Sequence, residues 1–153
     1  MRWGRYLILL MTALIWCFAI IFFPWLLHSG YPKVAVVISI FFSKVCHQVT
    51  ARSFGMGGLT FPVCSRCFAL YMGILAGILI SPIFKLLKYS VRPVQWLLLA
   101  GSGLTALDMS LDMLNLLSNT FFTRAITGSI LGLSFGLMVS LAIQGVEFEW
   151  KTT

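Results

Sequence analysis

The residues best suited to do chemistry are three cysteines and one histidine in the segment 46–67. Cys46 and His47 are adjacent, and Cys64 and Cys67 follow with the spacing Cys-x-x-Cys. This spacing lets two thiolates grip one ion, and three cysteines with one histidine form a tetrahedral zinc set. Cys46 and His47 are neighbours and would both have to turn toward the same ion. If one of them points elsewhere, the site has three ligands and an open position. We therefore predict a zinc-type site in the loop 46–67.

The same residues also suit thiol–disulfide exchange. Outside the cytoplasm they would meet an oxidising compartment, where Cys64 and Cys67 could form a redox pair with Cys46 as the third thiol. Small four-helix membrane proteins that pass electrons between thiols and quinones have a similar outline, so a quinone is the cofactor under this alternative. The fourth cysteine, Cys17, lies in the middle of an apolar segment and is expected to be inert packing.

The composition places these residues in a membrane protein. Of the 153 residues, 59% are hydrophobic and only 10% are charged, whereas soluble domains carry about 25% charged residues. The net charge of +7 comes largely from Lys and Arg at the ends of apolar segments, where they face lipid head groups. The charge therefore indicates the lipid bilayer as partner and no nucleic acid. We expect one polytopic domain, residues 1–153, in the inner (plasma) membrane.

The apolar segments predict an all-α membrane protein with four transmembrane helices and one short helix. Four segments have the length needed to cross a bilayer, at about 6–27, 68–84, 94–117 and 123–146. The segment at about 33–45 is too short, because its apolar part would extend only about 20 Å as a helix. It predicts an interfacial or re-entrant helix, since an open strand edge is not tolerated in lipid. Glycines at every fourth position predict close helix packing, namely Gly73 and Gly77, and Gly128, Gly132 and Gly136.

Four spans bring a set of polar residues to one membrane face. The Cys/His loop, the end of the third span and the start of the fourth must share that face, which predicts a polar pocket lined by Arg52, Arg66, Asp108, Asn119 and Arg124. A carboxylate in hydrocarbon is costly unless it is paired or hydrated. We expect Asp108 to pair with Arg124, either as a structural ion pair or as the relay of a proton- or ion-coupled transporter. Asp112 is expected nearer the surface and solvated.

The orientation rests on a small difference in basic residues between the two sides. The bias favours cytoplasmic termini and an extracytoplasmic Cys/His loop.

His28, at the end of the first span, is expected to be a solvated interfacial residue. The sequence contains no phosphate loop, dinucleotide motif or His-Glu-x-x-His motif. A chain this short with glycine-rich faces also suits a small subunit of a larger membrane complex.

The motif residues resemble a family of small bacterial and archaeal membrane proteins of unknown function. The resemblance rests on Cys46-His47-Gln48, Arg52-Ser53-Phe54, Pro62-Val63-Cys64 and Arg66-Cys67, and it continues at Asp108, Asn119, Arg124 and Thr127-Gly128. The chain differs from the family pattern at Phe68-Ala69, Met109 and Asp112. The resemblance implies an integral membrane protein of the same build, and it brings no activity with it.

Overall fold

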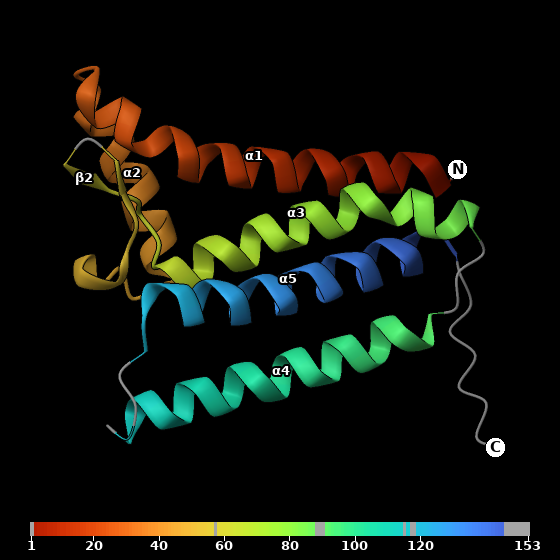
Figure 1. Ribbon diagram of the computed structural model, residues 1–153. Helices are drawn as coiled ribbons and strands as arrows, with labels where there is room; N and C mark the ends of the chain where they lie inside the picture. The colour runs from red at the N-terminus through yellow and green to blue at the C-terminus, as the bar shows by residue number, and fades with distance from the viewer. Residues whose placement is uncertain (1, 57, 88–90, 115, 117–118, 146–153) are drawn as a thin grey trace.

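The computed structural model describes residues 2–56, 58–87, 91–114, 116 and 119–145. Within them the chain forms five α-helices and one small hairpin (Figure 1). The helices are α1 (Arg2–His28), α2 (Pro32–Ser43), α3 (Ser65–Leu86), α4 (Arg92–Met113) and α5 (Phe121–Ile143). The 3-10 helix η1 (Thr50–Arg52) and the antiparallel strands β1 (Gly55–Met56) and β2 (Leu59–Thr60) lie between α2 and α3. The helical fold class is confirmed, and the hairpin is a feature that the sequence analysis did not predict.

Three of the described helices are long and apolar enough to cross a membrane: α1 from Trp3 to His28, α3 and α5. The short helix α2 has 12 residues, as the length of its apolar segment predicted. Helix α4 has 22 residues, as many as α3, and would extend about 33 Å. Its polar residues, including Asp108 and Asp112, leave it outside the set of apolar spans. A fourth span therefore stays a prediction.

Proline, glycine and threonine set several helix ends. Helix α1 stops before Gly30, whose φ of 79° lies in the left-handed region that favours glycine. The N–H of Tyr31 then donates to Leu26 O at 3.1 Å, and Pro32 opens α2. At the start of α5, the Thr120 side chain accepts a hydrogen bond from the N–H of Thr123 at 3.2 Å, which satisfies a donor at the helix end.

Helices α3 and α5 run side by side in the same direction and pack closely through glycine (Figure 1). A Cβ atom added to any of five glycines would lie less than 3.0 Å from backbone atoms of the facing helix, at Gly73, Gly77, Gly128, Gly132 and Gly136. Only glycine allows this approach, so the predicted close packing is confirmed. The parallel arrangement means that both helices begin at the same end of the bundle.

Polar contacts hold the opposite end of this helix pair. Ser81 Oγ and Ser140 Oγ lie 2.6 Å apart, and Gln144 Nε2 donates to both of them, at 2.8 Å and 3.2 Å. The Tyr6 hydroxyl of α1 donates to Ile78 O of α3 at 3.3 Å. The beginning of α1 therefore lies beside the ends of α3 and α5, so the segment 46–64 and the starts of α3 and α5 share the other end.

Candidate metal centre

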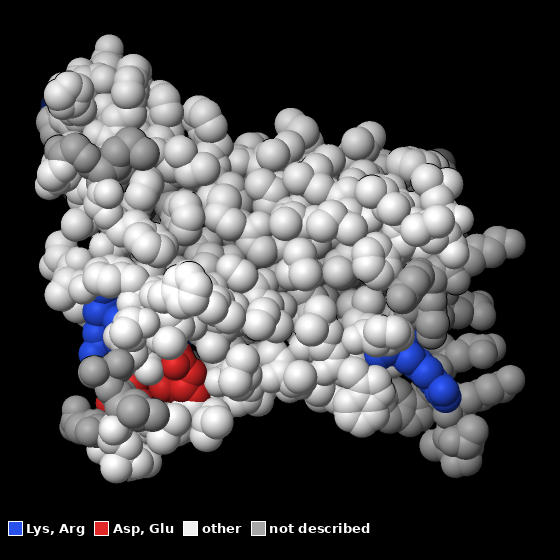
Figure 2. Space-filling model, viewed as in Figure 1, with Lys and Arg blue, Asp and Glu red and all other residues white. Residues whose placement is uncertain are grey.

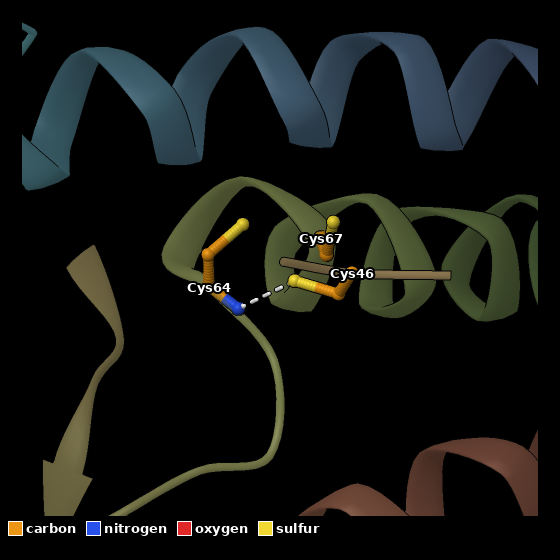
Figure 3. Close-up of side chains that lie close together, drawn as sticks. All are labelled: Cys46, Cys64 and Cys67. Carbon is orange, nitrogen blue, oxygen red and sulfur yellow. Dashed lines mark hydrogen bonds between the residues drawn. The ribbon is translucent and has the colours of Figure 1, made fainter. Parts of the chain in front are cut away.

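Three of the four cysteines come together at the beginning of α3. The Sγ atoms of Cys46, Cys64 and Cys67 all lie within 4.8 Å of one another (Figure 3). Cys46 follows α2, Cys64 is the residue before α3, and Cys67 lies in the first turn of that helix. The predicted loop 46–67 thus ends earlier than expected, because α3 begins at Ser65 and not at Phe68. Four sulfur ligands around a zinc ion would be about 3.8 Å apart for a Zn–S bond of about 2.3 Å, so this cluster is close to that geometry.

The backbone and the neighbouring thiols favour a thiolate in this cluster. The N–H of Cys64 donates to Cys46 Sγ at 3.2 Å (Figure 3). Hydrogen bonds with the Cys46 side chain, and then with the Cys67 side chain, lower the pKa of the Cys64 thiol well below its ordinary value. Hydrogen bonds with Cys46, and then with Cys64, raise the pKa of the Cys67 thiol, so the first thiolate of the cluster is at Cys64. Cys64 is the N-cap of α3, so this residue lies at the positive end of that helix. The cluster is therefore compatible with a metal site.

Apolar side chains enclose the sulfurs on the side of α1 and α2. Cys46 belongs to a buried cluster with Ile20, Phe42 and Val63. The Trp16 ring packs against this cluster, with its centroid 5.4 Å from that of Phe42 and 5.4 Å from that of Tyr71. These side chains cover Cys46, which is buried, while Cys64 and Cys67 are partly exposed. Burial at Cys46 strengthens electrostatic attraction between a thiolate and a bound cation.

Gln48 ties the segment containing Cys46 to the segment that leads into Cys64. Its side-chain Nε2 donates to Ser39 O at 2.8 Å and to Pro62 O at 2.9 Å. Its backbone φ of 50° is positive, an uncommon conformation for a residue other than glycine. Gln48 is part of the Cys-His-Gln motif, but no pattern in the sequence indicated a role for its side chain. The structure assigns it the position of a clamp between the two cysteine segments.

His47, the fourth predicted ligand, does not belong to this group of mutually close ligand atoms. Its side chain is exposed, while that of the adjacent Cys46 is buried. The difference in burial between these neighbours agrees with the three-ligand form of the site. A role for His47 as a ligand stays a prediction.

The predicted polar residues meet in one network of ion pairs and hydrogen bonds, which we call the charged network. Its centre is Asp112, whose carboxylate pairs with Arg52 Nη1 at 3.2 Å and with Arg124 Nη2 at 3.3 Å. The backbone N–H of Asn119 donates to Asp112 Oδ1 at 3.4 Å, and its side-chain Nδ2 donates to Asp108 O at 3.0 Å. Figure 2 shows acidic side chains beside basic ones at the end of the molecule where α3 and α5 begin.

Two pairings in the charged network correct the sequence analysis. Asp108 pairs with Arg66 and not with Arg124, and Asp112 is not simply solvated, because Arg52 and Arg124 both bind it. Arg124 lies in the first turn of α5 and Asp112 in the last turn of α4, so these two residues are at the same level. Asp108 is one turn further from that end, where it meets Arg66 from α3. The Arg124 side chain is only 8% exposed, so its charge depends on this pairing.

Two further residues lie apart from the candidate site. Cys17 is buried in α1, and its Sγ donates to Tyr71 O at 3.5 Å. It is not a member of the cysteine cluster. His28 is exposed at the last position of α1, as expected for a residue at the end of a span.

Comparison with known proteins places the chain in a class of membrane proteins. Residues 46–138 match the family described as "Predicted membrane protein (DUF2085)", and the chain belongs to this family. The matched region begins at Cys46 and includes all three clustered cysteines and the charged network. The chain is also 32% identical over 132 residues to the uncharacterized protein MJ1492 of Methanocaldococcus jannaschii. The aligned region covers 83% of this chain and 85% of that protein. No solved structure matches the chain.

Proposed function

We propose that this protein is a multi-pass membrane protein that holds a zinc-type metal ion at one membrane face. Cys46, Cys64 and Cys67 would bind the ion as thiolates, and His47, a water molecule or a substrate atom would complete the coordination. The mutual closeness of the three sulfurs carries this proposal. The N–H donated by Cys64 to Cys46 Sγ supports it, because hydrogen bonds to ligand atoms orient them and favour their charged form.

Charge balance also supports a metal ion in this position. The charged network contains three arginines and two aspartates, which leaves one positive charge. A divalent cation with three thiolates carries one negative charge, whereas three neutral thiols carry none. Arg66, which lies between Cys64 and Cys67 in the sequence, joins the two groups. The loaded site would therefore offset part of the excess charge of the network near Arg66, while water screens Arg52, whose side chain is 50% exposed.

The ion would act first as a structural clasp. It would join the end of α2 to the start of α3, two segments that are otherwise tied by Gln48 and by packing around Phe42. We further propose that α4 is a fourth span, since it is as long as α3 and packs along α5. In this proposal the termini lie in the cytoplasm, and the cysteine cluster lies on the outer side of the inner membrane. The protein would serve as a small subunit of a larger complex.

A quinone-linked thiol–disulfide oxidoreductase is the second candidate function, favoured by the same closeness of Cys64 to the two other thiols. Cys64 and Cys67 would lose two electrons and two protons to form a disulfide, and the quinone would take them up to become a quinol. A transporter that uses Asp108 as a relay has less support, because Arg66 binds that carboxylate. A relay needs a carboxyl group that is open to the transported ion, whereas the Asp108 carboxylate is occupied by its ion pair with Arg66.

Substitution of Cys64 distinguishes the metal site from the redox pair. We expect Cys64→Ser to lose the metal and to melt at a lower temperature, since metal binding and folding are coupled. The matched control is Cys17→Ser, which removes a buried thiol outside the cluster and should retain the metal. Metal content and thermal unfolding are measured for both variants in detergent. An equally stable Cys64→Ser protein, together with a redox-dependent gel shift of the unmodified chain, would favour the oxidoreductase.

A further inference from the structure

A groove between α1 and α2 has the size of a ligand site and an apolar lining. Its volume is about 370 Å³, within the range of about 300–1,000 Å³ that ligand pockets occupy. It is lined by Thr12, Ile15, Trp16 and Ala19 of α1 and by Val37, Ile38, Phe41 and Phe42 of α2. Thr12 is the one lining residue with a hydroxyl group, and it donates that hydroxyl to Ile8 O at 2.8 Å. The groove therefore suits a hydrocarbon chain and makes little demand for polar groups.

A positive charge stands one helical turn from this groove. Lys33 precedes Val37 by four residues on α2, so the two side chains lie on the same face of the helix. Lys33 is exposed, and the ion pairs among the described residues all involve arginines. Lys33 lies at the beginning of α2, just after the end of the spanning helix α1. An apolar groove in the membrane with a cation toward its outer end matches the two parts of an anionic phospholipid.

We propose that the groove binds one acyl chain of an anionic phospholipid, whose phosphate group lies at Lys33. The chain runs between the two helices from Val37 toward Thr12. On α1, Ala19 and Thr12 are seven residues apart, so this part of the groove is about 10 Å long. It accommodates the upper part of an acyl chain, and the remainder continues along α1 in the bilayer.

This lipid site would adjoin the cysteine cluster. Phe42 and Trp16 line the groove, and they also pack in the buried cluster that contains Cys46. A bound chain would press α2 against α1 and so support the position of Cys46. The lipid site does not depend on which ion, if any, the cysteines hold.

The test counts the phospholipid that the protein retains. The protein is reconstituted in vesicles of equal parts phosphatidylglycerol and phosphatidylcholine, extracted in mild detergent, and examined by native mass spectrometry. Val37→Trp fills the groove at a position that is 66% exposed. Val36→Trp is its matched control, because Val36 is 54% exposed on the same helix and does not line the groove. Lys33→Glu reverses the charge near the groove, and Arg5→Glu makes the same change at an exposed position of α1 that is seven residues from the nearest lining residue, Thr12.

We expect the unmodified protein, Val36→Trp and Arg5→Glu to retain phosphatidylglycerol in preference to phosphatidylcholine. Val37→Trp should reduce retention by about tenfold, and Lys33→Glu should abolish the preference for the anionic lipid. Equal retention by Val37→Trp and Val36→Trp would overturn the proposal. So would equal retention of the two lipids by the unmodified protein, which would show unspecific annular lipid.

Discussion

The clamp formed by Gln48 allows a quantitative test of how the fold supports the cysteine cluster. Gln48→Ala removes the two hydrogen bonds donated to Ser39 O and Pro62 O, at 2.8 Å and 2.9 Å, and a longer one accepted from Ser39 Oγ at 3.4 Å. The two short bonds contribute about 1 kcal/mol each, so the loss is about 2 kcal/mol if the freed groups of Ser39 and Pro62 find water and the long bond adds little. Residue 48 has a positive φ, which is equally unfavourable for alanine and for glutamine. The backbone conformation therefore does not add to the difference between the two proteins.

The free energy lost with the hydrogen bonds of Gln48 should also weaken the binding of the metal ion. Gln48 holds the Cys46 segment against the segment that leads to Cys64, so the variant must order these segments when it binds the ion. A cost of about 2 kcal/mol corresponds to a loss of about 30-fold in affinity. This value lies within the range of about 10–100-fold found when a residue that supports metal ligands is removed.

The assay is competition for zinc between the purified protein and a chromophoric chelator in detergent at constant pH. Gln95→Ala serves as the control, because Gln95 lies on α4, a helix that contributes no cysteine to the cluster. We expect a lower zinc affinity for Gln48→Ala and an unchanged affinity for Gln95→Ala. If both variants compete as well as the unmodified protein, Gln48 does not position the cysteines and our account of the clamp is wrong.

The remaining predictions concern helix packing, the charged network and pH. Gly132→Ala should destabilise the protein by about 1–3 kcal/mol, because the added Cβ would meet the backbone of Leu70. Gly103→Ala should not, since nothing lies within 4 Å of a Cβ at that position. Thermal unfolding of both variants checks this, and equal melting temperatures would refute the close packing. Asp108→Asn and Arg66→Gln should each lower the melting temperature, and the double variant should show a coupling of about 0.5–3 kcal/mol; additive effects would contradict the ion pair. Zinc should dissociate as the pH falls, because thiolate ligands must be deprotonated to bind it; dialysis at a series of pH values followed by metal analysis measures this, and retention independent of pH would argue against thiolate ligands.

Much of the helical fold could be predicted because long apolar segments leave few alternatives in a membrane. The expected segment at 6–27 lies within α1, and that at 68–84 lies within α3. The convergence of the cysteines with the polar residues also followed from topology, since α3 and α5 must begin where α4 ends. Close packing of α3 against α5 followed from glycine at every fourth position.

The pairings inside the charged network could not be predicted in the same way. Which carboxylate meets which arginine depends on the rotation of each helix about its axis, and the length of a segment does not determine that rotation. The start of α3 at Ser65 adds a turn that carries Arg66 to Asp108. The role of Gln48 likewise depends on a positive φ, and apart from its place in the Cys-His-Gln motif no sequence pattern indicated it.

The central claim is that Cys46, Cys64 and Cys67 hold one metal ion, and the most direct measurement is metal content together with a count of free thiols. The protein is purified in detergent without added metal or chelator, and its thiols are titrated before and after addition of a chelator. Our account predicts about one zinc per chain, with Cys46, Cys64 and Cys67 protected until the chelator removes the ion. Absence of metal, together with a disulfide between Cys64 and Cys67, would contradict it and would make electron transfer the function to test.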